Sequence, residues 1–179
     1  MRTSGQHIPS WTRFIFMMRA VLLTLLVTSG IGCYSFKGFA PDPALETYRI
    51  DRFNLTAPNA PPNINQTFTE GLKRKISRES RLILDENDPD IQFGGAITRY
   101  HVSSVSPEPG EFAALQRLEI TVNIEYTNFN DPEDKWTQGF SFFADYAPDV
   151  NLLDVQDELI ETIFDQINED IFNRAFTNW

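Results

Sequence analysis

The chain has 179 residues, 41% of them hydrophobic and 15 of them Phe, a composition that excludes a disordered chain and favours one packed domain. Its formal net charge of -10 excludes nucleic acid as a partner, because an acidic surface cannot replace the counterions of a phosphate backbone. The same charge gives the protein part no overall attraction to anionic lipid.

The N-terminal segment has the features of an export signal. Residues 20–31 form a run of apolar and small residues that is too short to span a bilayer stably but suits the core of a signal peptide. Arg19 supplies a positive flank, and we predict a lipoprotein signal peptide over residues 1–32. Met17 and Met18 lie directly before Arg19, so either of them is an alternative translation start.

Cys33 is the only cysteine of the chain, which excludes an internal disulfide. The sequence Gly-Ile-Gly-Cys at 30–33 resembles the lipobox of bacterial lipoproteins, although Gly30 stands where that pattern prefers Leu. We predict that the Cys33 thiol is lipidated, with several acyl chains such as palmitate, and that residues 33–43 form a lipidated N-terminus and tether. The alternative is a plain secretory signal followed by an incidental cysteine.

The body of the chain begins with a predicted strand over residues 45–55. A bend is expected near Asp51, because the alternation of apolar residues changes phase there. A proline-rich loop comes next. A helix then follows, since apolar side chains recur every four residues along one stripe: Ile64, Phe68, Leu72 and Ile76. Asn63 or Asn65 is the expected cap of this helix.

Basic residues gather toward the C-terminal end of this helix: Lys73, Arg74, Lys75 and Arg78. At that end they complement the negative pole of the helix dipole, and charges at helix ends are usually solvated. We favour this interpretation over the functional alternative, which is contact with a phosphate group or with an acidic partner surface.

Three strands follow, after a short extended piece at 82–84. In the first, apolar residues alternate from 91 to 97 and continue in shifted phase at Tyr100 and Val102, and Gly94-Gly95 mark a bulge or a close approach between backbones. The second shows the clearest alternation in the chain, and the third returns after an Asn-Asp-Pro turn. These two strands are expected over residues 117–126 and 136–146.

The chain ends with a long predicted helix over residues 152–176, which Asn151 is expected to cap. The order of elements is therefore β-α-β-β-β-α. We predict one α+β domain over residues 44–179, a two-layer sandwich in which two helices cover one face of a four-stranded, mainly antiparallel sheet.

The sequence offers no arrangement of catalytic residues, and we predict that the protein is not an enzyme. His101 is the only histidine after Cys33, so no set of nucleophile, base and acid can be assembled. The acidic segment 86–90 lacks the Gly and distal Glu of a calcium loop, and no residues have the spacing of metal ligands. We therefore expect neither a metal nor a cofactor.

Four segments of the chain resemble the Bacteroidota branch of the LptE family of lipopolysaccharide-assembly lipoproteins. They are Cys-Tyr-Ser-Phe-Lys-Gly at 33–38, Asn-Gln-Thr-Phe-Thr-Glu at 65–70, Phe-Ala-Asp-Tyr at 143–146 and Asp-Ile-Phe-Asn-Arg-Ala-Phe-Thr-Asn-Trp at 170–179. The resemblance implies a lipid-anchored, periplasm-facing protein of the outer membrane. It would plug an LptD-like β-barrel, assist the assembly of that barrel and help to deliver lipopolysaccharide to the cell surface.

Members of this family are thought to contact lipopolysaccharide through basic residues near strand ends and loops. On the predicted sheet the basic candidates for that contact are Arg99, Arg117 and Lys135. The alternative function is a lipid-anchored periplasmic binding or structural module for another partner or a small ligand. A cleft lined by Trp136, Phe143 and Tyr146 would favour this alternative.

Overall fold

Three long strands form the body of the sheet: β4 (Ile91–Val105), β5 (Leu115–Asn128) and β6 (Lys135–Tyr146). They pair antiparallel in chain order. The structure is a computed structural model that describes residues 44–106 and 114–177. On β5 the predicted alternation is confirmed, because the even-numbered residues from Leu118 to Tyr126 are buried while their neighbours are more exposed.

Shorter strands lie along the outer edge of β4. β1 (Thr47–Ile50) and β2 (Asn54–Leu55) both pair parallel to β4, and β3 (Ile83–Leu84) pairs parallel to β1. The sheet order is β3-β1-β4-β5-β6, with β2 beside β4. The α+β class is confirmed, but the strand count exceeds the predicted four. The predicted first strand is split at its bend, and the extended piece at 82–84 joins the sheet.

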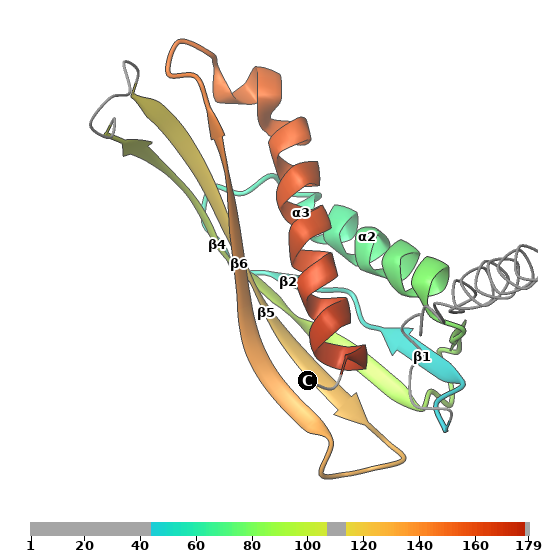
Figure 1. Ribbon diagram of the computed structural model, residues 1–179. Helices are drawn as coiled ribbons and strands as arrows, with labels where there is room; N and C mark the ends of the chain where they lie inside the picture. Colours follow the sequence, from blue (N-terminus) through green and yellow to red (C-terminus); the bar gives the residue numbers. More distant parts are fainter. Residues whose placement is uncertain (1–43, 107–113, 178–179) are drawn as a thin grey trace, which may run out of the picture. The chain divides into compact units, whose positions relative to one another are not determined.

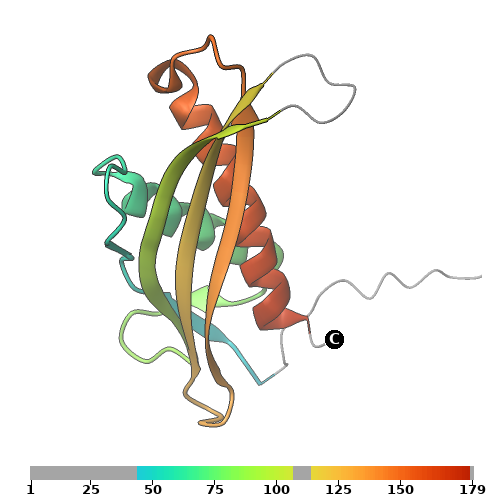
Figure 2. The same cartoon turned by 90° about the vertical axis from the view of Figure 1, so that its left-hand side faces the viewer.

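Two helices, α2 (Ile64–Glu79) and α3 (Leu152–Phe176), cover one face of this sheet (Figure 1). The opposite face of β4, β5 and β6 carries no helix (Figure 2). The predicted stripe of α2 is buried along its whole length. The Asn151 side chain accepts a hydrogen bond from the Leu153 N–H at 3.1 Å, which confirms the predicted cap of α3. Asn63 occupies the cap position of α2, but its side chain makes no cap hydrogen bond.

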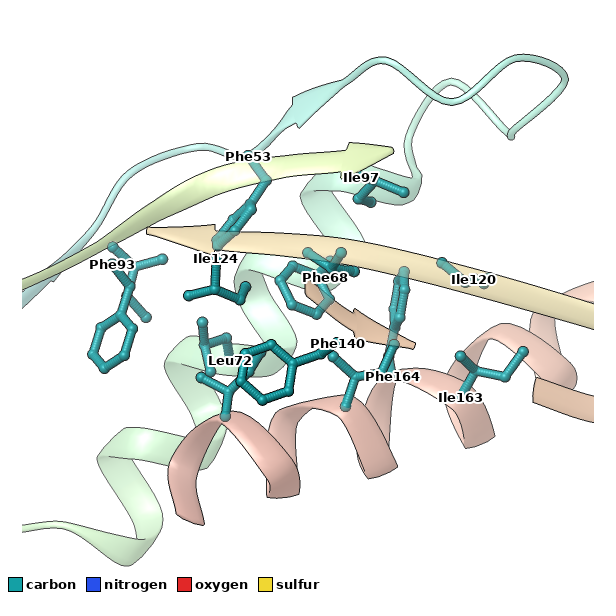
Figure 3. Packing of buried hydrophobic residues seen from close by; sticks show 14 of the residues in the cluster. Phe53, Phe68, Leu72, Phe93, Ile97, Ile120, Ile124, Phe140, Ile163 and Phe164 are labelled. Atoms are coloured by element: carbon teal, nitrogen blue, oxygen red, sulfur yellow. The ribbon is translucent and has the colours of Figure 1, made fainter. Parts of the chain in front are cut away.

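A chain of aromatic rings joins the sheet edge to both helices (Figure 3). The Phe68 ring on α2 lies edge-on between two others, 4.8 Å from the centroid of Phe53 and 5.0 Å from that of Phe164 on α3. Phe68 is completely buried. Edge-to-face contacts at these distances stabilise a core beyond the area they bury, so this row fixes the helix layer on the sheet.

Two polar side chains of α2 stabilise the break between β1 and β2. At the break the backbone leaves the ladder, and Phe53 turns into the core with 1% of its surface exposed. The Asn65 side chain donates to the Phe53 carbonyl at 2.9 Å, and the Phe53 N–H donates to Thr69 Oγ1 at 3.4 Å. Both side chains are buried. The sequence suggested Asn65 as a helix cap. In the structure its side chain instead binds the backbone of the segment between β1 and β2.

Gly95 is the close backbone approach that the sequence predicts. Its φ of 137° lies in the region that favours glycine, and a Cβ there would lie 2.0 Å from the Asn123 carbonyl oxygen of β5. The bulge lies further along β4, where the register with β5 shifts between Ile97 and Arg99. This shift explains the predicted change of phase before Tyr100.

The Asp90 carboxylate ties the start of β1 to the start of β4 and to the β5–β6 turn. Its Oδ2 accepts hydrogen bonds from the Glu46 N–H at 2.8 Å and the Thr47 N–H at 2.9 Å. Its Oδ1 accepts from the Asn130 side chain at 2.8 Å. These donors, with the Glu46 N–H first, lower the pKa of Asp90 from 3.8 to about 2.

We expect Gly95→Ala to lower the free energy of unfolding by about 2–4 kcal/mol, because it combines a strained φ with a backbone clash. Gly139→Ala on β6 is the matched control. A Cβ there meets Asn123 Oδ1 at an ordinary 3.5 Å, so stability should stay within about 1 kcal/mol of the wild type. Urea denaturation measures both, and equal losses would contradict the assignment.

Asp90 should make stability depend on acid. Because folding lowers its pKa, its contribution is present above pH 3.8 and is lost as pH falls toward about 2. The free energy of unfolding should therefore fall over this range in the wild type and fall less steeply in Asp90→Asn. Denaturant titrations at several pH values test this expectation, and parallel curves would refute it.

Candidate functional site

The surface of β4, β5 and β6 that carries no helix is here called the open face (Figure 2). The strand register and the burial pattern of β5 place the three predicted basic residues on it. Its centre consists of small or short polar side chains, brought side by side by the strand register: Gly94, Ala96, Thr121, Asn123, Gly139 and Ser141. Arg99 and Glu125 border this centre, opposite Thr121 and Gly94, and the other charged residues lie toward its ends. The centre of the open face therefore presents little side-chain bulk to an approaching partner.

Arg117 forms the best-defined interaction on the open face. Its Nε and Nη2 donate to the two carboxylate oxygens of Asp145 at 2.6 and 2.8 Å. The guanidinium also lies 3.6 Å from the centroid of the Phe143 ring, and Phe143 is 43% exposed. The hydrogen bonds from Arg117 lower the pKa of Asp145. A bidentate, stacked arginine is held in one orientation, and its charge is already met by a carboxylate.

Arg99 lies near this pair but has its own acidic partner. Its Nε is 3.3 Å from Glu119 Oε2, and the other carboxylate oxygen, Oε1, accepts a hydrogen bond from Ser141 Oγ at 3.2 Å. Glu119 is two residues from Arg117 on β5 and lies opposite Phe143 on β6. The structure thus brings Arg99 and Arg117 together at one end of the open face. The cluster of two bases and two acids carries no net charge.

Lys135 does not join this cluster. It begins β6 opposite Thr127, and it is exposed. Ten residues of strand separate it from Asp145, which corresponds to about 33 Å. No carboxylate of the described residues forms an ion pair with it. The three predicted basic residues therefore do not form one binding site, although Lys135 keeps an unneutralised charge.

The predicted aromatic cleft is not formed, because its three residues lie on two faces of β6. Trp136 and Tyr146 pack against the core on the helix side, whereas Phe143 lies on the open face. Trp136 stacks on Tyr126 with 5.2 Å between ring centroids. The interpretation failed because alternate residues of a strand point to opposite faces, so an odd spacing from Phe143 separates them. Cys33, the predicted lipidation site, lies outside the described residues.

A hollow that sequence reasoning missed lies between β1 and α2. It has a volume of about 530 Å³, and three basic side chains line it: Arg49, Arg52 and Lys73. Acidic side chains line it as well, among them Glu70 and Glu86. Such a mixed lining suits polar groups of either sign. The basic end of α2 was the one signal in the sequence for it, since the other residues come from separate segments.

Within residues 44–106 and 114–177, no three His, Cys, Asp or Glu side chains are grouped to hold a metal ion. In the same ranges no helix has the length and apolar character to cross a bilayer. His101 is exposed on β4, opposite Glu119 on β5.

Comparison with known families decides the class of this protein. The family model described as "LptE: Lipopolysaccharide-assembly" matches residues 46–175, which span almost the whole described domain. The chain belongs to the LptE family. It is therefore placed among the lipopolysaccharide-assembly lipoproteins of the cell envelope, which are not enzymes. No curated protein matches the sequence significantly.

Several solved structures are similar to this chain at low sequence identity. A hypothetical protein from Chlamydia trachomatis superposes with a TM-score of 0.51 at 9% identity, covering 75% of this chain and 100% of the other. An uncharacterized lipoprotein B from Nitrosomonas europaea gives 0.48 at 12%, covering 78% and 86%. The rare lipoprotein B from Shewanella oneidensis gives 0.45 at 13%, covering 70% and 92%.

The two ion pairs of the open face should differ in strength. A double-mutant cycle of Arg117→Ala and Asp145→Ala should give the larger coupling free energy, because the pair is bidentate and held by Phe143. The cycle of Arg99→Ala and Glu119→Ala should give about 0.3 kcal/mol or less, because that pair is single and more exposed. Urea denaturation of both cycles tests the difference, and equal couplings would count against it.

Proposed function

We propose that this protein is an outer-membrane lipoprotein, anchored through lipidated Cys33, that partners and plugs an LptD-like β-barrel. In that role it assists the assembly of the barrel and the transport of lipopolysaccharide to the cell surface. The observation that carries the proposal is the family match over residues 46–175. The predicted signal peptide over residues 1–32, which ends at the single cysteine, supports the anchor.

The open face is the surface on which we place the contact with the barrel. The helices bury the other face of the sheet, so β4, β5 and β6 leave one broad surface of the sheet uncovered (Figure 2). Its centre of small residues around Gly139 and Ala96 allows close approach of another surface. The Arg117–Asp145 pair presents a fixed orientation at one end of it. These features favour a docking role over a chemical one.

Direct contact with lipopolysaccharide is the finer part of the proposal. Arg99 and Arg117 would have to exchange their carboxylate partners for lipid phosphate. Lys135 has no such partner among the described residues, so it is the first candidate for a phosphate contact. The cluster that contains Arg99 and Arg117 lies at the other end of the open face. Its role would then be to orient that face against the barrel rather than to bind lipid.

Affinity purification of the full-length protein from detergent-extracted membranes tests the barrel partner. We expect a large outer-membrane barrel protein to be recovered, and we expect its yield to fall strongly for Cys33→Ala, which cannot be anchored. Lys135→Glu tests the lipid contact separately and should weaken the binding of purified lipopolysaccharide.

Mass spectrometry of the purified protein reports whether Cys33 carries lipid. A lipidated, folded protein that reproducibly recovers no barrel would overturn the proposed partner while leaving the family assignment in place.

A further inference from the structure

A second hollow, here called the Phe129 hollow, lies where the break between β1 and β2 meets the open face. Its lining comes from that break, from the first half of β4, from the end of β5 and from the turn after β5. Its volume of about 380 Å³ lies within the range of small-molecule sites. Three residues with little or no side chain contribute to the lining and leave room above the strand: Gly94, Gly95 and Ala96.

A hydrogen-bond network holds two polar groups of the Phe129 hollow in place. The Gln92 side-chain oxygen accepts from Arg49 Nη2 at 2.6 Å, and its nitrogen donates to Asp51 Oδ2. Arg49 Nε lies 3.2 Å from the other carboxylate oxygen of Asp51. Gln92 and Asp51 both line the hollow. Because a carboxylate can accept several hydrogen bonds, Asp51 is oriented by this network and can still accept from a ligand.

Three further polar side chains of the lining have no internal partner. Arg52, Asn54 and Glu125 are exposed, and their side chains form no hydrogen bond or ion pair within residues 44–106 and 114–177. Together they offer donors and acceptors on flat groups. Hydroxyl groups on adjacent carbon atoms both donate and accept, so one flat group can bind two of them at once.

Phe129 gives the hollow an exposed aromatic ring. Its surface is 52% exposed, and its backbone is fixed because its N–H donates to the Asp90 carbonyl at 2.7 Å. The ring stacks on no other aromatic ring of the described part of the chain. The face of such a ring carries partial negative charge, which attracts the polarised C–H groups on one face of a sugar ring.

The charges around the hollow are close to balanced. Asp51 is already paired with Arg49, and the unpaired Arg52 and Glu125 carry opposite signs. A phosphate or an ammonium group would therefore find no excess of opposite charge here. An exposed ring beside flat polar groups, with little net charge, matches an uncharged ligand that is rich in hydroxyl groups.

We propose that the Phe129 hollow binds an uncharged saccharide. The Phe129 ring stacks on the face of one sugar ring, while Asp51, Asn54 and Glu125 form hydrogen bonds with its hydroxyl groups. A soluble oligosaccharide and the glycan part of a larger envelope molecule share this chemistry. The site goes beyond the proposed function, because it requires neither the lipid anchor nor the barrel partner.

The test titrates the full-length protein, purified in a detergent without sugar head groups, with neutral hexasaccharides. The probes are the hexamers of α-1,4-linked glucose, of β-1,4-linked glucose and of β-1,4-linked N-acetylglucosamine. Calorimetry measures the affinity, and saturation-transfer NMR identifies the sugar protons in contact. We expect at least one probe to bind, with an affinity that stays the same from about 0.05 to 1 M salt, because no charge is neutralised.

A fourth probe distinguishes the two sources of the saccharide. It is the glycan of lipopolysaccharide after removal of its acyl chains and phosphate groups. Tighter binding of this glycan than of all three hexamers assigns the site to an envelope glycan, and the reverse order assigns it to a soluble oligosaccharide. Both orders support a saccharide site.

Variants at Phe129 separate stacking from general apolar contact. Phe129→Leu keeps an apolar side chain but removes the ring, and it should weaken binding about tenfold. Phe129→Trp should keep or increase the affinity. Leu153→Ala is the control for loss of an exposed apolar side chain elsewhere, on α3, and should bind as the wild type does. Circular dichroism confirms that each variant is folded.

Binding of none of the four glycans would overturn the proposal. Wild-type affinity in Phe129→Leu would also overturn it, as would an affinity that falls steeply with salt, which indicates an ionic ligand instead. Failure to recover a barrel protein, or a Cys33 thiol without lipid, would leave the titrations unaffected.

Discussion

The structure depends on the burial of Phe68 between Phe53 and Phe164. This ring contacts the broken edge strand on one side and the C-terminal helix on the other, so three segments distant in sequence meet at one side chain. The break between β1 and β2 turns Phe53 inward, and Asn65 and Thr69 satisfy the backbone that the break exposes. Without this arrangement α2 would have no fixed position over the parallel edge of the sheet.

Because both helices lie on one side, the two faces of the sheet obey different constraints. The buried face accepts only well-packed apolar side chains, whereas the open face can combine small residues with a few paired charges. The distribution of charge then matters more than its sum. Acidic residues outnumber basic ones in the chain. Several basic residues near the end of α2 form no ion pair within the described residues, whereas Arg99 and Arg117 on the open face are each paired with a carboxylate.

Elements with a strong local period could be predicted from the sequence. The alternation on β5 and the long stripe of α3 follow from spacing alone, and so did the bend in the first strand. The pairing of Arg117 with Asp145 could not be predicted, because it depends on the register that β6 adopts against β5. The role of Asn65 could not be predicted either. A polar residue beside an apolar helical stripe gives no sign that its side chain binds a buried carbonyl in another segment.

The position of Asp90 has a mechanical consequence for a domain held by its N-terminus. Any pull along the tether reaches the fold at Glu46 and Thr47, which are both bound by this carboxylate. The same carboxylate holds Asn130 beyond β5, and the Phe129 N–H donates to the Asp90 carbonyl at 2.7 Å. Load is therefore shared among the starts of two parallel strands and the distant turn, so that β1 is not peeled off alone.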